Sequence, residues 1–207
     1  MNPKELVLKN PIISEQIEET ELLVILEVLE KTLNLDIEGD ICEFGCFAGT
    51  TSLFLQRLLI ENKSKKKLYL YDSFEGLPDK SEQDQSAAGT DFVGGELMAS
   101  KSQLKLNFKK AGIPLPKVKK AWFQDLKPRD IPKQICFAFL DGDFYQSVKE
   151  PLNLIKHKVL SGGAVIIDDY DNPALPGAQK AVNEFLHHNP NFRLTKTTHS
   201  LAILTKS

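Results

Sequence analysis

The chain has 207 residues, of which 42% are hydrophobic and 26% are charged, a composition typical of one globular domain with a single core. Lys and Arg together number 26 and Asp and Glu number 28, a near balance that disfavours a nucleic-acid partner. No run of about 20 apolar residues offers a membrane span, and no signal peptide is recognisable, so we expect a cytoplasmic protein without a membrane partner.

Helical and extended patterns alternate along the chain. Apolar residues recur at helical spacing from Ser14 to Leu33, which predicts an amphipathic N-terminal helix. The expected strands then cover 39–47, 67–74, 117–125, 134–143, 162–171, 192–198 and 200–207, and the expected helices cover 50–61, 96–112, 148–159 and 176–189. We therefore divide the chain into an N-terminal helical segment, 1–37, that packs on or covers the site, and one domain, 38–207.

Two of the expected strands lie at 136–140 (CFAFL) and 164–169 (AVIIDD). Their apolar residues follow one another without a break, instead of alternating with polar residues. Strands covered by helices on both faces have this pattern. The fold class is thus predicted to be α/β, with a Rossmann-like, doubly wound, mostly parallel seven-stranded sheet. Ligands of such sheets bind at the carboxyl ends of the strands.

The longest irregular stretch, Glu75 to Gly95, is rich in Gly, Ser, Asp and Pro. Loops of that length in compact domains are usually lids or disordered segments, and we expect a lid over the site.

The three cysteines, Cys42, Cys46 and Cys136, lie among apolar residues. They are expected to be buried thiols in a reducing compartment, and a Cys42–Cys46 metal site is the weaker alternative. The sequence leaves the oligomeric state open, with a homo-oligomer as one option.

Acidic residues gather at the predicted strand ends, where they are expected to converge on one rim of the sheet. They are Glu43, Asp72, Asp125, Asp141, Asp143, Asp168 and Asp169. Desolvating several carboxylates together is costly unless a cation compensates them.

The first strand runs through a glycine-bearing loop into a helix, with Glu43, Gly45, Phe47, Gly49 and Thr51 at fixed spacing. Glycines allow a ligand to approach the backbone, and the amides at a helix start, with the Thr51 hydroxyl, suit a carboxylate. An ordinary strand-to-helix turn is the alternative. A carboxylate at the end of the second strand, here Asp72, is placed to accept both ribose hydroxyls of a nucleoside. Together these features favour a ligand that contains adenosine.

Asp141 and the pair Asp168 and Asp169 follow consecutive predicted strands of the parallel sheet and should meet at its edge. Mg2+ takes oxygen ligands, so three aspartates would hold such an ion. The alternative, that aspartates cap the following helices, applies more to Asp143 and Asp171 than to the adjacent pair.

Trp122 and Gln124, just before Asp125, are placed to border an adenine ring, although core packing is the alternative for Trp122. The four histidines and the Lys63–Lys67 run are interpreted as structural or surface features.

Six segments resemble, in order and spacing, the macrocin O-methyltransferase family of sugar methyltransferases. They read GDICEFGCFAGTTS, YLYDSFEGLP, AWFQDLKP, FLDGDFYQSV, LSGGAVIIDDYD and GAQKAVNEF, and the match covers about residues 38–207. The resemblance implies a class I methyltransferase fold, S-adenosylmethionine as the methyl donor, Mg2+ as cofactor and a sugar hydroxyl as the small-molecule acceptor.

The resemblance also implies roles for individual residues. Those that the resemblance places at the donor are Glu43, Gly45, Thr51, Asp72, Ser73 and Asp125; those at the metal are Asp141, Asp168 and Asp169; Asp141 or Asp143 would be the general base. Phe47, Gly49, Trp122 and Gln124 are added to the donor site from their positions in the loop after the first strand and just before Asp125. Two departures bear on the acceptor: Asp125-Leu126-Lys127 stands where the family usually has Asp-Thr-Leu, and the N-terminal region is shorter.

The expected function is therefore a metal-dependent O-methyltransferase that acts on a sugar or another vicinal diol. An NAD-dependent oxidoreductase on the same sheet, and a protein that binds S-adenosylmethionine without turnover, are the alternatives.

Overall fold

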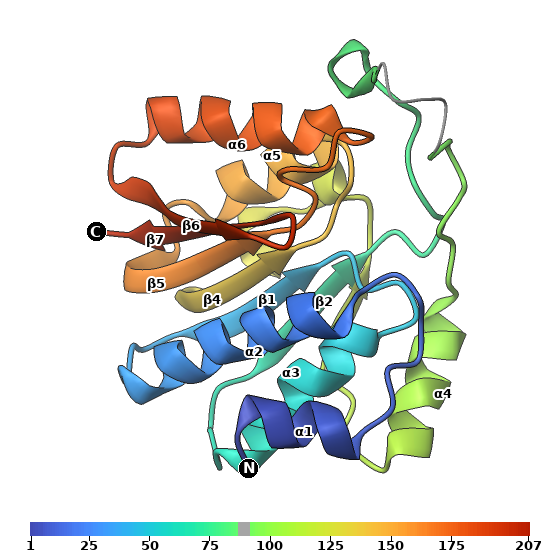
Figure 1. Ribbon diagram of the computed structural model, residues 1–207, viewed down its shortest axis with the longest axis vertical. Coiled ribbons are helices and arrows are strands. Elements are labelled where there is room, and N and C mark those ends of the chain that lie inside the picture. Colours follow the sequence, from blue (N-terminus) through green and yellow to red (C-terminus); the bar gives the residue numbers. More distant parts are fainter. Residues whose placement is uncertain (87–91) are drawn as a thin grey trace.

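A seven-stranded sheet in the order β3-β2-β1-β4-β5-β7-β6 forms the centre of the computed structural model, which describes residues 1–86 and 92–207 (Figure 1). The strands are β1 (Asp40–Phe44), β2 (Leu68–Asp72), β3 (Lys117–Lys120), β4 (Ile135–Leu140), β5 (Val159–Ile167), β6 (Phe192–Thr198) and β7 (Leu201–Lys206). Strands β1 to β5 pair in parallel, and β7 runs antiparallel to both β5 and β6. The predicted doubly wound, mostly parallel sheet is confirmed.

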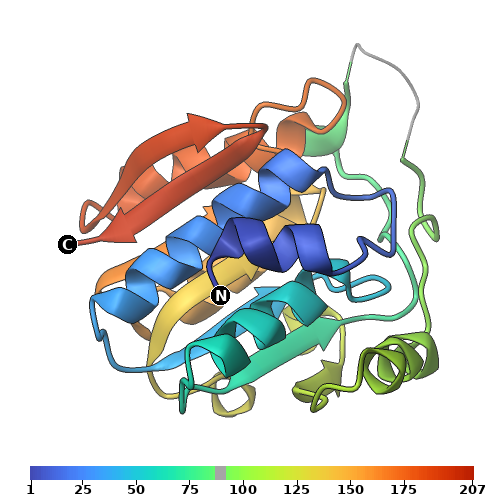
Figure 2. The ribbon, with the colours of Figure 1, turned by 60° about the horizontal axis from the view of Figure 1, so that its bottom comes forward.

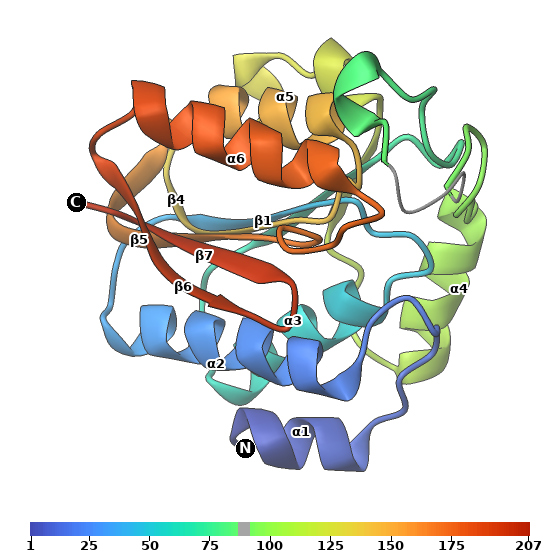
Figure 3. The same cartoon turned by 45° about the horizontal axis from the view of Figure 1, so that its top comes forward.

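Helices cover both faces of the sheet (Figure 3). One face carries α2 (Glu19–Asn34), α3 (Thr50–Glu61) and α4 (Lys101–Ala111), and the other carries α5 (Tyr145–Ile155) and α6 (Pro176–His188). Between β3 and β4 the chain makes only two 3-10 turns, η2 (Phe123–Asp125) and η3 (Pro128–Asp130).

Alternate residues of each central strand enter two separate hydrophobic clusters, because successive side chains of a strand point to opposite faces. In β4, Phe137 and Phe139 pack with residues of α2 and α3, whereas Ala138 and Leu140 pack with residues of α5 and α6. All four are fully or almost fully buried. This two-sided burial explains why the strand is apolar throughout.

The N-terminal region contains two helices where one was predicted. The first, α1 (Pro3–Lys9), begins with proline at its first turn, and the Asn2 side chain accepts a hydrogen bond of 2.9 Å from the Glu5 amide. These are ordinary helix-start signals that the sequence analysis did not use. Figure 2 shows α1 lying outside α2 and α3, away from the sheet.

The second helix, α2, begins at Glu19 rather than at Ser14. A capping box fixes this start, since the Glu18 amide donates to the Glu21 carboxylate at 2.9 Å. The preceding residues form a turn, although Ile17 is still buried. Helix α2 contacts β4 and β5, so this segment packs directly on the sheet.

Other boundaries also differ from the prediction. Helix α4 begins at Lys101, not at 96, because the Ser100 hydroxyl accepts from the Gln103 amide at 3.1 Å and caps the helix there. Strand β3 ends at Lys120, five residues before Asp125. The three cysteines are buried and free, as predicted. Across residues 1–86 and 92–207, no helix has the length and apolarity that crossing a membrane requires.

Candidate functional site

A cavity of about 480 Å³ opens at the carboxyl ends of the parallel strands. Its wall is formed by the loops that follow β1, β2, β3, β4 and β5, by the turn before α2 and its first residues, and by parts of the segment between β2 and α4. This is the edge at which doubly wound sheets bind their ligands.

The loop after β1 begins at Gly45, a position that only glycine can occupy. Its φ is +86°, and a Cβ there would lie 1.8 Å from the Asp141 carbonyl oxygen. The ends of β1 and β4 therefore touch, as the 2.8 Å hydrogen bond from the Asp141 amide to the Phe44 carbonyl also shows. This contact brings the glycine-bearing loop beside the aspartates that follow β4.

The Asp72 carboxylate fixes the same loop. One of its oxygens accepts from the Cys46 and Phe47 amides at 2.7 and 3.1 Å, and the other accepts from the Phe74 amide at 2.6 Å. A carboxylate has about four acceptor positions, so three bonds leave room for about one more. Asp72 thus retains about one acceptor position that faces the cavity.

The predicted donor residues divide into two groups. Those that line the cavity are Gly45, Phe47, Asp72, Ser73, Trp122 and Gln124; those that do not are Glu43, Gly49, Thr51 and Asp125. Thr51 is buried, and Gly49 packs so closely on α4 that a Cβ would lie 2.4 Å from the Leu104 side chain. Asp125 ends η2 and is exposed.

Glu43 lies in the core beneath the loop. It is 1% exposed, and its carboxylate accepts a 2.6 Å hydrogen bond from the Ser52 hydroxyl. Burial raises the pKa of Glu43 to about 8, although the Ser52 bond acts in the opposite direction. The side chain joins β1 to α3 and is not in contact with the cavity.

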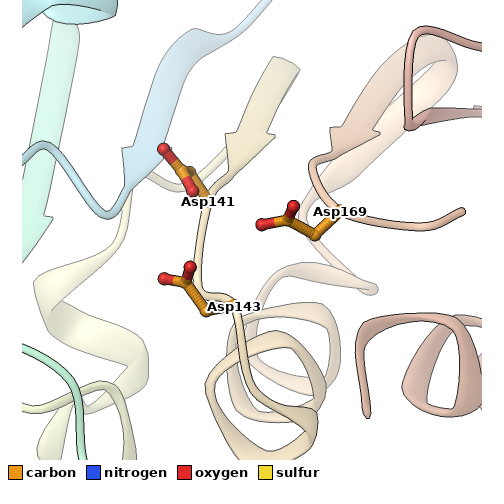
Figure 4. A group of neighbouring side chains, drawn as sticks. All are labelled: Asp141, Asp143 and Asp169. Atoms are coloured by element: carbon orange, nitrogen blue, oxygen red, sulfur yellow. The ribbon is translucent and has the colours of Figure 1, made fainter. Parts of the chain in front are cut away.

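Three carboxylates meet in the centre of the cavity. Asp141, Asp143 and Asp169 each present an oxygen, and these oxygens lie within 4.8 Å of one another. In Figure 4 Asp141 and Asp143 extend from the turn after β4 and Asp169 faces them from the end of β5. Asp143 and Asp169 both have positive φ, 58° and 56°, so these aspartates stand at sharp bends.

This group differs by one member from the predicted metal set. Asp168 also lines the cavity, but it is 8% exposed and one of its oxygens accepts from the Asp169 amide at 2.9 Å. The Asp169 carboxylate in turn accepts a 2.8 Å hydrogen bond from the Asn172 side chain, a partner that the sequence analysis missed. Asp168 thus holds the Asp169 backbone with one oxygen while it borders the cavity, and Asp143 completes the group of three.

Burial raises the pKa values of all four aspartates, and repulsion from neighbouring carboxylates adds to this rise at Asp141, Asp143 and Asp168. Burial is the largest cause at Asp141, followed by the charges of Asp168 and Asp143, and its pKa lies well above the usual range. Burial followed by the charge of Asp169 raises the pKa of Asp143 to about 7. A bound cation would relieve this repulsion.

The segment between β2 and α4 closes the far side of the cavity, along the right of Figure 1. Within it, the buried Asp84 accepts from the Tyr145 amide at 2.6 Å and so caps α5 from a distant part of the chain. Leu77 packs with Phe144 and Leu175. The predicted lid, Glu75 to Gly95, has residues 87–91 outside the described part, so only its flanks are placed.

The family model of macrocin O-methyltransferase (TylF) matches residues 16–196. The chain belongs to the macrocin O-methyltransferase family. Within that match lie strands β1 to β5, most of β6, and Asp141, Asp143 and Asp169.

Members of the family and related folds share the architecture. An 8-demethyl-8-(2,3-dimethoxy-alpha-L-rhamnosyl)-tetracenomycin-C 4'-O-methyltransferase from Streptomyces olivaceus is 29% identical over 76% of this chain, which spans 61% of that protein. The O-methyltransferase NovP is 24% identical with a TM-score of 0.80, over 92% of this chain and 81% of NovP. CalS11, a TDP-rhamnose 3'-O-methyltransferase of calicheamicin biosynthesis, is 20% identical with a TM-score of 0.65, over 98% and 92%.

Proposed function

We propose that this protein transfers a methyl group from S-adenosylmethionine to a hydroxyl of a sugar or similar vicinal diol, with a divalent cation such as Mg2+ held by its aspartates. One observation carries the proposal. A single cavity joins a glycine-bearing loop and Asp72 at one end to three convergent carboxylates at its centre. Family membership supports the reaction type. The tetracenomycin methyltransferase is longer than this chain, which spans 61% of it, so the acceptor class is part of the proposal.

The donor is assigned to the end of the cavity formed by the loops after β1, β2 and β3. Gly45 exposes backbone there, Asp72 retains a position for a ribose hydroxyl, and Trp122 and Gln124 offer a border for the adenine. The three amide bonds to Asp72 hold this carboxylate in place before the donor arrives. Preorganisation of this kind lowers the entropic cost of binding.

The three central carboxylates fit a hard divalent cation. Their oxygens are close together, buried enough to have raised pKa values, and of the type that Mg2+ prefers. Asp141, Asp143 and Asp169 would hold the ion, with Asp168 next to Asp169 at the border of the cavity. When bound, the cation supplies Lewis acidity that lowers the pKa of an acceptor hydroxyl.

The chain's own task is then to align the acceptor oxygen with the methyl carbon and sulfur and to remove one proton. The sulfonium methyl is already activated, so no covalent nucleophile is needed. Asp141 and Asp143 are the candidate bases, because both line the cavity beside the proposed ion. A cation lowers the pKa of the carboxylate that holds it, so the carboxylate oxygen that does not bind the ion would take the proton. A vicinal diol offers two oxygens to the bound cation, so its reacting hydroxyl is held in a more defined orientation than the single hydroxyl of a mono-ol.

The test is methyl transfer from S-adenosylmethionine to matched diol and mono-ol glycosides, with Mg2+ and with EDTA. We expect turnover of the diol alone, loss in EDTA and recovery with added Mg2+. Asp169→Asn should abolish turnover while S-adenosylhomocysteine still binds. Asp171→Asn is the matched control, since Asp171 is adjacent but exposed and outside the cavity lining. Full activity in EDTA would show that the aspartates serve structure only.

A second measurement separates the two possible third ligands. Calorimetric titration with Mn2+ should show a larger loss of affinity in Asp143→Asn than in Asp168→Asn if the geometric group is the ligand set. The reverse order would restore the set predicted from sequence, Asp141, Asp168 and Asp169, and leave Asp143 solely as the base.

A further inference from the structure

The charged residues that line the cavity are all acidic in the described part of the chain. Ten of the residues in the cavity wall are Asp or Glu, and within the described part of the chain none of the lining residues is Lys, Arg or His. Residues 87–91, which are not described, read Ala-Ala-Gly-Thr-Asp and so bring no base either.

Neither a donor nor a cation neutralises this wall completely. Three carboxylates already exceed the charge of one divalent ion, and S-adenosylmethionine carries a net single positive charge. Four further acids come from other elements: Glu15 from the turn before α2, Glu21 from its first turn, Asp79 from the segment after β2, and Glu150 from α5. A concave site with low-dielectric walls concentrates the field of such charges on its contents.

Three basic residues have partners among or next to the lining residues but are not part of the lining. Lys80 lies over the ring of Phe144, 5.8 Å from its centre. Lys120 forms a 3.0 Å ion pair with Glu75. His199 is exposed, and its charge partly opposes the burial that raises the pKa of Glu21. None of these residues lines the volume in which an acceptor would lie.

Resting on the proposed function, we infer that the acceptor is a glycoside without phosphate, and that a basic amine on it strengthens binding. The diphosphate of a nucleotide sugar would bring two negative charges against a wall whose described residues include no basic side chain, and like charges brought together weaken binding. The named substrates of two similar proteins, a rhamnosyl tetracenomycin and TDP-rhamnose, represent the two alternatives. The wall favours the first type. A glycosyl transfer must then precede this methylation and supply its substrate.

Three isosteric rhamnosides test the inference: 2-hydroxyethyl, 2-aminoethyl and 2-phosphoethyl α-L-rhamnoside, with dTDP-L-rhamnose as a fourth probe. Their binding is measured by calorimetry on the full chain with saturating Mg2+ and S-adenosylhomocysteine. We expect the aminoethyl glycoside to bind about fivefold more tightly than the hydroxyethyl one, as one partly exposed ion pair would give. Both phosphorylated probes should bind at least about tenfold more weakly than the hydroxyethyl glycoside.

Variants identify the source of the preference. Glu21→Gln and Glu150→Gln should each lower the ratio of aminoethyl to hydroxyethyl affinity, and the double variant should lower it further. Glu27→Gln, on the same helix as Glu21 but exposed and outside the lining, is the matched control and should leave that ratio as it is.

Tightest binding of dTDP-L-rhamnose or of the phosphoethyl glycoside would overturn the inference. Equal affinities for all probes, or binding of none of them, would refute the amine preference. Binding of S-adenosylhomocysteine in the same samples keeps these results separate from the proposed function, because the donor site would remain intact if only the acceptor class were wrong.

Discussion

Glu43 offers a stability prediction whose magnitude follows from its burial. Its pKa rises from 4.5 to about 8 in the folded protein. The folded state therefore binds the proton more tightly than the unfolded state, and the free energy of unfolding falls as pH rises from about 4.5 to about 8. At about 1.4 kcal/mol per pKa unit, the loss approaches about 5 kcal/mol at pH 9. A side chain that is 1% exposed receives little screening by solvent.

Glu43→Gln removes this titration and keeps the shape of the side chain. Urea unfolding at pH 5.5 and pH 9, with the same Mg2+ in both proteins, measures the change in stability with pH. We expect a steeper loss in the wild type than in the variant, by several kcal/mol. The aspartates of the cavity titrate in both proteins, so the difference reports Glu43 together with its effect on the pKa of Asp141. Equal pH dependence in the two proteins would refute the view that Glu43 is protonated when folded.

Three further substitutions test the scaffold of the site. Gly45→Ala would place a methyl group against the Asp141 carbonyl, so we expect a loss above about 3 kcal/mol in urea unfolding or no folded protein, and a wild-type midpoint would contradict the close approach. Asp72→Ala should weaken the binding of S-adenosylhomocysteine, measured by calorimetry, at least about tenfold, with the affinity for Mn2+ nearly retained. Unchanged affinity for S-adenosylhomocysteine would show that Asp72 is not part of the donor site. Asp84→Ala removes the cap on the Tyr145 amide and should cost about 2 to 4 kcal/mol and speed hydrogen exchange of that amide, whereas unchanged exchange would show that the cap is unimportant.

Periodicity predicted the sheet well because each central strand is buried on both faces. The apolar run of β4 follows from that burial, whereas its place between β1 and β5 was not predicted, because burial does not determine which strands pair. Helix starts were harder, since capping bonds decide them locally. Glu18 and Ser100 set the starts of α2 and α4 five residues later than the apolar pattern suggested.

Site residues were predicted where they directly follow an apolar strand. They were missed where their role depends on contacts with a distant part of the chain. Asp141 and Asp169 follow apolar strands directly, and they meet as expected. Asp84 caps α5 from a separate loop, so no local pattern marked it. Glu43 fits the motif equally well by sequence, yet its position in β1 turns it into the core, and only the backbone direction reveals this.

The central claim is that the cavity holds S-adenosylmethionine, and ligand stabilisation by S-adenosylhomocysteine tests it most directly. At 100 times its dissociation constant, a ligand adds about 2.7 kcal/mol to the free energy of unfolding. For a chain of this size, that corresponds to a rise in melting temperature of roughly 5 to 11 °C. We predict this rise with S-adenosylhomocysteine and none with NAD. No shift at millimolar S-adenosylhomocysteine, together with stabilisation by NAD, would contradict the account.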